Sequence, residues 1–140
     1  MPIRPEHRFF YPIDWPQLSA VIRFGRAGGR CERCARPHGQ VIVCLDGGAW
    51  WDAQAGAWRS GRGRVLRRVP DLASARLTVP ILAACHREHD TSRNGDADLA
   101  AWCQRCHLEH DRPEHSRRRR LTYLRRRALG DLFLGPYPTA

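Results

Sequence analysis

The sequence predicts a small domain of the α+β class that is held together by a cluster of cysteines. Short apolar runs rich in β-branched residues, at 41–45 and 77–85, are bounded by turn-forming residues and predict strands. Apolar residues recur at helical spacing over 15–26 and 98–110 and predict helices. Two Cys-x-x-Cys units lie far apart in the chain, and together they offer the four thiolate ligands of one tetrahedral zinc ion.

The composition points to a soluble protein with a polyanionic partner. The 140 residues suit a single domain. All 24 basic residues are arginines and they outnumber the 14 acidic residues, which gives a net charge of +10. Such a surplus is typical of nucleic-acid-binding proteins. No apolar run approaches the ~20 residues of a membrane span, and the N-terminus lacks the apolar core of a signal peptide. We therefore expect a cytoplasmic protein with no membrane partner, whose paired cysteines bind metal rather than form disulfides.

The N-terminal half is expected to be an arm, a helix and an interrupted sheet. Residues 1–16 are rich in proline and aromatic residues and predict an extended arm on the surface. The helix over 15–26 follows, and Pro80 inside the strand over 77–85 predicts an edge strand or a bulge. Residues 49–76 show little periodicity and predict an irregular hairpin or an inserted loop.

Four of the six cysteines form the two Cys-x-x-Cys units, Cys31–Cys34 and Cys103–Cys106. Two such pairs make the S4 site of a structural Zn2+, and a loop-rich chain with a modest core gains folding free energy from this ion. The long gap between the units requires an insertion within a core that spans 31–110. Cys44 lies in an apolar run and is expected in the hydrophobic core.

The segment that ends in the second Cys-x-x-Cys unit also carries His, Glu, Asp and Asn. It contains ACHREHD, then Asn94, then DLAAWCQRCH, in which His107 directly follows Cys106. This order resembles the HNH family of nucleases, and short phrases elsewhere in the chain resemble its phage and prophage members. The resemblance implies the ββα-metal fold, in which the Cys-x-x-Cys pairs hold a structural zinc ion beside the catalytic site.

The resemblance implies roles for individual residues. His86, at the end of a strand, fits the general base, and His107 fits a ligand of the catalytic divalent ion, which would be Mg2+, Mn2+, Ni2+ or Zn2+. Asp98 takes the position of the asparagine that braces the loop. Two residues depart from the family pattern. Cys85 stands where the family has Asp or His as a second metal ligand, and Asp98 lacks the amide donors of asparagine.

The sequence also allows a second assignment of the general base and its neighbouring metal ligand. Glu88 and His89 also form an acid–histidine pair, in which Glu88 would bind the metal and His89 would be the base. We favour His86, because the second assignment places the base closer to Asp98 than is common in the family. Glu88 or His89 then replaces Cys85 as the metal ligand.

The C-terminal part predicts a basic helix over 114–130, which Pro113 separates from the helix over 98–110. Leu121, Leu124 and Ala128 would face inward. Seven arginines on this helix are expected to bind the phosphates of DNA without reading its sequence. They are Arg117, Arg118, Arg119, Arg120, Arg125, Arg126 and Arg127.

Together these features predict a metal-dependent endonuclease that nicks or cuts DNA. A neutral imidazole can take a proton from water near pH 7, and a divalent cation can stabilise the leaving oxygen. The resemblance to phage proteins implies DNA processing or packaging in a bacterial host cell, with phage packaging proteins as partners. The alternative is a degenerate relative that keeps the zinc ion and the arginines and binds DNA without cleaving it, which the residues at Cys85 and Asp98 leave open.

Overall fold

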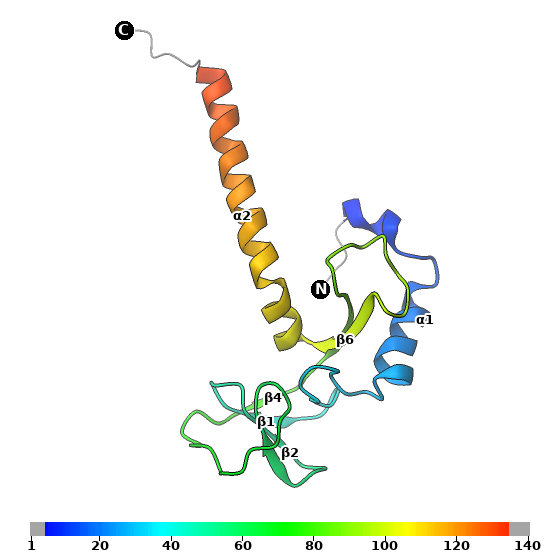
Figure 1. Ribbon diagram of the computed structural model, residues 1–140, viewed down its shortest axis with the longest axis vertical. Coiled ribbons are helices and arrows are strands. Elements are labelled where there is room, and N and C mark those ends of the chain that lie inside the picture. The colour runs from blue at the N-terminus through cyan, green and yellow to red at the C-terminus, as the bar shows by residue number, and fades with distance from the viewer. Residues whose placement is uncertain (1–4, 135–140) are drawn as a thin grey trace. The chain divides into compact units, whose positions relative to one another are not determined.

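The computed structural model describes the backbone of residues 5–134, and the chain divides into two compact units, 1–107 and 108–140. The first unit contains every strand of the described residues, as Figure 1 shows. The second contains most of the long C-terminal helix. Among the described residues, no helix combines the length and the apolarity that crossing a bilayer needs. The predicted α+β class is therefore confirmed.

The N-terminal segment is more helical than the sequence indicates. A 3-10 helix, η1 (Pro5–Phe10), replaces part of the extended arm that we expect over 1–16. The helix predicted over 15–26 is present as α1 (Trp15–Ala20), which continues as a π-helical turn, η2 (Val21–Arg26). Pro16 stands in the first turn of α1, where the missing N–H of proline costs no helical hydrogen bond.

A four-stranded antiparallel sheet has the order β3-β2-β1-β4. The strand predicted over 41–45 is β1 (Ile42–Cys44), and β4 is Arg76–Thr78. The predicted insertion supplies the other two strands, β2 (Trp50–Asp52) and β3 (Ala57–Arg59), which form a hairpin. The insertion is thus an integral part of the sheet, because β2 pairs with β1.

The single strand predicted over 77–85 is two strands in two different sheets. Pro80 lies between β4 and β5 (Leu82–His86), and β5 pairs with β6 (Leu99–Cys103) in a separate two-stranded sheet. Proline has no N–H to donate to a ladder, so the chain leaves the first sheet there.

The prediction of a helix that begins at Asp98 is wrong over its first turns, because Leu99–Cys103 forms the strand β6. All five residues of β6 are buried. One face of the β5–β6 hairpin packs on α1 and η2 and the other packs on the cysteines. A strand that is buried on both faces shows no apolar–polar alternation, so its pattern cannot be distinguished from that of a buried helix.

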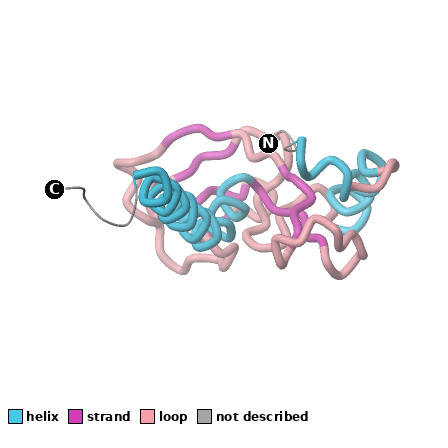
Figure 2. The backbone as a smooth tube through the Cα atoms, turned by 90° about the horizontal axis from the view of Figure 1, so that it is seen from above, coloured by secondary structure: helices cyan, strands magenta, loops and turns pink. Residues whose placement is uncertain are grey.

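The C-terminal helix α2 (Gln104–Leu134) is continuous, although we expect two helices with a break at Pro113 (Figure 2). A proline inside a helix removes one backbone hydrogen bond. The glutamate, leucine and arginine residues around it are strong helix formers, and the helix continues through it. Leu121 and Leu124 are exposed and do not face inward as predicted. Within its own unit, α2 has no second described element against which they could pack.

Three small clusters make up the core of the first unit. The largest contains the four cysteines of the Cys-x-x-Cys units together with Leu82, Cys85, Ala100 and Trp102. The second joins Ile22 of η2 to Leu99 and Ala101 of β6. The third contains Ile42, Cys44 and Trp50 of the four-stranded sheet, which confirms the core position predicted for Cys44.

Candidate functional site

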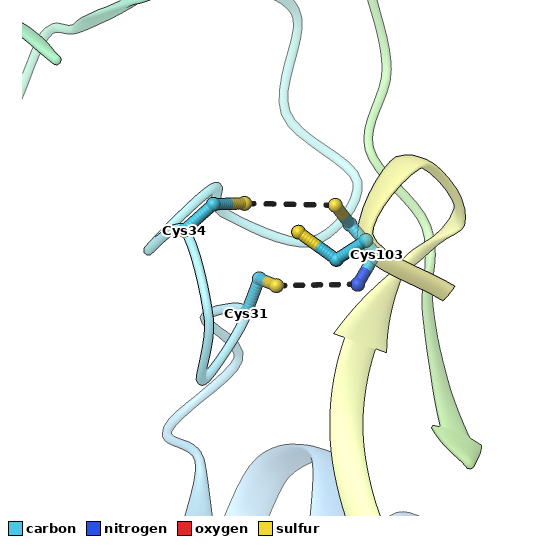
Figure 3. A group of neighbouring side chains, drawn as sticks. Cys31, Cys34 and Cys103 are labelled. Atoms are coloured by element: carbon cyan, nitrogen blue, oxygen red, sulfur yellow. Dashed lines mark hydrogen bonds between the residues drawn. The ribbon is translucent and has the colours of Figure 1, made fainter. Parts of the chain in front are cut away.

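The four cysteines of the two Cys-x-x-Cys units meet in the core, as their spacing predicts. Cys31 and Cys34 lie on a tight turn after η2, whereas Cys103 ends β6 and Cys106 lies in the first turn of α2. All four are buried, and their sulfur atoms lie within 4.8 Å of one another. Figure 3 shows the sulfur atoms of Cys31, Cys34 and Cys103 turned toward a common centre.

The spacing of these sulfur atoms fits a zinc ion. Cys34 Sγ and Cys103 Sγ are 3.6 Å apart. Four sulfurs that each lie about 2.3 Å from a central zinc ion are separated by about 3.8 Å along the edges of the tetrahedron. Hydrogen bonding with Cys106, and then with Cys31 and Cys34, lowers the pKa of the Cys103 thiol. Hydrogen bonding with Cys103 in turn raises the pKa of the Cys106 thiol, so one thiol of this pair ionises at the expense of the other. The thiolate is the form that binds metal, and the cluster could hold a structural zinc ion.

Arg36 places a buried positive charge beside the cluster. Its side chain is 3% exposed, and its guanidinium donates to Cys34 Sγ at 3.4 Å and to the Gly48 carbonyl at 2.7 Å. A buried charge is costly unless a partner compensates it. A zinc ion with four thiolates carries a net charge of −2, so a buried guanidinium is a fitting neighbour for it. The sequence pattern alone does not indicate this position for Arg36.

Glu32 joins the first Cys-x-x-Cys unit to β6. Its backbone N–H donates to the Ala101 carbonyl at 2.9 Å, and its carboxylate accepts from the Ala101 N–H at 2.9 Å. Arg26 of η2 pairs with the same carboxylate at 2.8 Å and donates to the carbonyls of Asp96 and Leu99. The hydrogen bond to Glu32 raises the pKa of Arg26 above its usual range. This network connects the cysteine cluster to the loop between β5 and β6.

His86 is the last residue of β5 and faces α1, whereas its neighbour Cys85 faces the cysteine cluster. The imidazole stacks on Trp15 with a centroid distance of 5.7 Å and an interplanar angle of 8°. The ring of Tyr11 meets it edge-on at 5.5 Å. Two aromatic rings therefore fix the orientation of this side chain, and the N-terminal segment supplies both of them.

Asn94 fixes which nitrogen of His86 carries the proton. The Asn94 amide group donates to the carbonyls of Phe10 at 3.0 Å and Thr91 at 3.2 Å. Its oxygen therefore faces His86 Nε2, which lies 3.0 Å away. Because an amide oxygen only accepts hydrogen bonds, Nε2 carries the proton of the neutral ring, and the lone pair lies on Nδ1.

A small pocket of about 50 Å³ opens beside His86 in the β5–β6 loop. Its lining combines the imidazole with two arginines and three carboxylates, from Arg87, Glu88, Asp90, Arg93 and Asp98. Arg93 bridges Glu88 at 2.5 Å and Asp98 at 2.8 Å. Hydrogen bonds from Ser92 hold the pKa of Asp90 below its ordinary value.

Asp98 holds together the end of this loop. Its carboxylate accepts from the Gly95 N–H at 3.1 Å, and its carbonyl accepts from the Arg87 N–H at 2.9 Å. The resemblance to HNH nucleases implies a brace at this position. In the structure two residues hold the loop in different ways, since Asn94 contacts the histidine and Asp98 contacts the backbone.

The residues expected to hold a catalytic ion are not all in one place. Glu88 lines the pocket, whereas Cys85 is buried in the cysteine cluster. His107 lies in the first turn of α2. Among the described residues, the possible ligand atoms of Cys85, Glu88 and His107 do not form a group within 4.8 Å of one another. His89 lies three residues beyond the end of β5, with a left-handed backbone (φ +59°).

The seven arginines predicted to bind phosphate are all exposed on α2. Arg117 and Arg118 pair with Glu114 at 3.1 and 2.7 Å. Arg127 lies over the ring of Tyr123, with its guanidinium carbon 5.8 Å from the centroid. Exposed pairs of this kind contribute little stability, so these arginines remain accessible to an anionic ligand.

Several residues of this site carry no recognisable signal in the sequence. From the sequence no role is predicted for Arg36 or Arg93, and Tyr11 and Trp15 are predicted as parts of an aromatic arm and of a segment that resembles phage members of the HNH family. The one available signal was Asn94, a polar residue in the same segment as the histidines. Comparison with known proteins finds no matching family model, no similar curated protein and no similar solved structure.

Proposed function

We propose that this protein is a metal-dependent endonuclease that hydrolyses the phosphodiester bonds of DNA. It would use a ββα-metal arrangement that a structural zinc ion stabilises. The observation that carries the proposal is the setting of His86. This histidine ends the first strand of a hairpin, its ring is held by Trp15 and Tyr11, and its Nδ1 lone pair is the basic position.

The order of the elements supports this proposal. The strands β5 and β6 pair as antiparallel neighbours, and α2 follows β6 directly. This is the succession of two strands and a helix that the HNH resemblance implies. His86 takes the strand-end position in that scheme, and His107 follows the second Cys-x-x-Cys unit on the helix.

In the proposed reaction, His86 Nδ1 accepts a proton from the attacking water. The Asn94 oxygen then stabilises the imidazolium through the Nε2 proton. Arg87 and Arg93 contribute positive charge on the lining of the adjacent pocket, where a phosphate would lie. Glu88, Asp90 and Asp98 each offer a carboxylate, the type of ligand that suits Mg2+ or Mn2+. The three do not form a group within 4.8 Å of one another, so an ion would be held by fewer than three of them. Such an ion, when bound, supplies charge that stabilises the phosphate and the leaving oxygen.

The exposed arginines of α2 would supply sequence-independent affinity for the DNA backbone. They carry seven positive charges, and guanidinium groups bind phosphate in a bidentate manner. The affinity should fall as salt rises, because each neutralised phosphate releases counterions. The resemblance to phage proteins makes phage DNA processing or packaging the setting that we propose.

A second candidate function is DNA binding without cleavage. The position of Cys85 favours it, since this residue faces the cysteine cluster and does not join Glu88 in the pocket. A protein of this kind would keep the zinc site and the basic helix but would lack a complete ion site.

Incubation with supercoiled plasmid separates these two candidates. We expect the wild-type protein to nick the plasmid in the presence of Mg2+, Mn2+ or Ni2+, and we expect His86→Ala to reduce the rate by at least about 100-fold. His115→Ala, which changes an exposed histidine on α2, is the matched control and should nick normally. Absence of nicking with every ion would reject the endonuclease. Normal nicking by His86→Ala together with loss in His89→Ala would move the base to His89.

A further inference from the structure

The four-stranded sheet presents a continuous apolar row on the face that lies away from its core. Directly paired positions place Leu77 opposite Val43 and Trp51 opposite Trp58. The pairing of Cys44 with Trp50 sets Val43 beside Trp51. The row therefore crosses all four strands without interruption, from β4 through β1 and β2 to β3.

This row is accessible, in contrast to the opposite face of the same sheet. The opposite face holds Ile42, Cys44 and Trp50, and Trp50 is fully buried. On the outer face, Leu77 is 73% exposed, and Trp51 and Trp58 are both partly exposed. The two indole rings are neighbours, with centroids 5.7 Å apart and an interplanar angle of 61°. A contiguous apolar patch rimmed by polar residues is typical of an interaction surface.

The segment that follows β3 places positive charge along one edge of this face. The residues 59–68 contain five arginines and no acidic residue. Four of the five, Arg62, Arg64, Arg67 and Arg68, are exposed, and none of them forms an ion pair with another described residue. The Leu66 N–H donates to the Trp58 carbonyl at 2.8 Å, so this arginine-rich segment lies along the outer edge of β3.

We propose that the outer face of the β3-β2-β1-β4 sheet binds single-stranded nucleic acid. Unpaired bases would stack on Trp51 and Trp58, and the backbone phosphates would pair with the arginines of 62–68. Aromatic platforms beside a positive groove bind single strands because every base has an apolar π-face and every nucleotide carries a charge. A duplex conceals its base faces, so this surface discriminates strandedness. The proposal goes beyond the cleavage reaction, since the surface shares no residue with the pocket beside His86.

Binding to a fluorescein-labelled 20-mer of thymidine tests this proposal. Anisotropy is measured on the full chain, without added divalent ion, against a 20-base-pair duplex as the second probe. We expect the single strand to quench tryptophan fluorescence. We also expect Trp51→Leu/Trp58→Leu to weaken single-strand binding by about tenfold or more and duplex binding by less than about twofold. Trp51→Phe/Trp58→Phe keeps an aromatic face and should retain affinity within about threefold.

Two control variants separate stacking from general effects. Phe9→Leu removes an exposed aromatic ring from η1 and should leave single-strand binding unchanged. Arg62→Gln/Arg64→Gln/Arg67→Gln/Arg68→Gln should weaken single-strand binding and reduce its salt dependence by up to about four phosphate contacts. Melting curves of each variant show whether the fold is intact.

Three outcomes would overturn the proposal. If Trp51→Leu/Trp58→Leu binds the single strand with the affinity of the wild-type protein, base stacking on these residues is excluded. If the leucine and phenylalanine double variants are both folded and lose the same amount of single-strand affinity, base stacking is also excluded. If sedimentation shows a dimer that the leucine pair dissociates, while oligonucleotide binding is unchanged, the face is a contact between two copies of this chain. Because no cleavage is measured, these results are independent of the plasmid assay.

Discussion

At the residue scale, the hydrogen bonds of Asn94 decide which atom of His86 is basic. The Asn94 amide group donates to two backbone carbonyls, so only its oxygen is available to the ring. A histidine with Nε2 protonated presents Nδ1 as a proton acceptor. Asn94 is therefore a positioning residue for the base, and Asp98 holds the loop that carries it.

Replacement of Asn94 should slow plasmid nicking by about tenfold or more, because the ring loses the partner that fixes its tautomer. Asn94→Asp keeps an acceptor for Nε2, but it places a negative charge next to the ring and stabilises the imidazolium. The pH at which activity appears should then move upward for Asn94→Asp and downward for Asn94→Ala, which loses the oxygen that stabilises the imidazolium. Rate profiles between pH 5 and 9 measure this difference, and identical profiles for the two variants would contradict the role of Asn94.

At the element scale, the inserted hairpin packs directly on the first Cys-x-x-Cys unit. Gly63, in the turn after β3, has a φ of +82°, and a Cβ atom added there would lie 3.0 Å from the backbone of Cys34. Gly56, in the turn between β2 and β3, has a φ of +60° but meets nothing within 4 Å. These two glycines share a left-handed backbone and differ in their surroundings.

Gly63→Ala should therefore destabilise the protein more than Gly56→Ala. The left-handed backbone alone costs about 1 kcal/mol in either variant. In Gly63→Ala the added Cβ atom would also displace the turn that carries Cys31 and Cys34. We therefore expect the free energy of unfolding to fall further, by about 1–3 kcal/mol, and zinc to be retained less tightly. Urea unfolding and a zinc-release assay measure both effects. Equal stability of the two variants would show that the contact between Gly63 and the turn of Cys31 and Cys34 does not contribute.

The same hairpin contains a buried carboxylate whose ionisation stabilises it. Asp52 is 2% exposed, accepts from Arg59 at 2.7 Å and lies 3.4 Å from Arg30. Burial opposes its charge, yet the hydrogen bonds from Arg59 and Arg30 hold the pKa of Asp52 below its ordinary value. The folded state thus binds this proton less tightly than the unfolded state does. The stabilisation is complete above the unfolded pKa of about 4 and is lost as the pH falls below it.

Asp52→Asn should lower the free energy of unfolding by about 1–3 kcal/mol at pH 7, since the amide cannot replace a charged acceptor for two arginines. The difference between the variant and the wild type should shrink as the pH falls from 4 toward 2. Chemical unfolding at several pH values provides the measurement, with Asp71→Asn as a control on an exposed carboxylate. A difference that is constant over this range would exclude the ionised carboxylate as the cause.

At the scale of the whole molecule, the cysteine cluster is the junction of the first unit. It joins the turn after η2, the end of β6 and the first turn of α2, and the hairpin packs against it. The three apolar clusters are small, so the core by itself gives a limited share of the stability. A bound zinc ion would add its binding free energy to the folded state.

Removal of zinc should therefore unfold the first unit. We expect about one equivalent of zinc in the purified protein, and we expect a strong chelator to abolish cooperative melting until zinc is restored. Cys103→Ser should lose the ion, whereas Cys44→Ser, which changes a buried cysteine outside the cluster, should retain it. Metal analysis together with calorimetry gives the answer. A full equivalent of zinc in Cys103→Ser would rule out the S4 site.

The fold could be predicted from local signals only in part. β1 and the first turns of the N-terminal helix follow from patterns of a few residues. The sequence of β6 predicts a helix, because burial on both faces removes the alternation that identifies a strand. The break expected at Pro113 was also wrong, since one proline costs less than the surrounding helix formers contribute. Both errors arise where neighbours outside the local segment determine the outcome.

The sequence by itself determined the cysteine cluster, because two Cys-x-x-Cys units restrict four thiols to one coordination sphere once the chain folds. It also determined the positive charge of α2, which depends on composition and helical propensity alone. Only the tertiary structure decided the surroundings of His86, since Tyr11 and Trp15 reach it from the N-terminal segment and the fold of the β5–β6 loop turns Asn94 back toward it. Only strand register placed Trp51 beside Trp58 on an exposed face, because pairing across strands is set by long-range hydrogen bonds and not by sequence spacing.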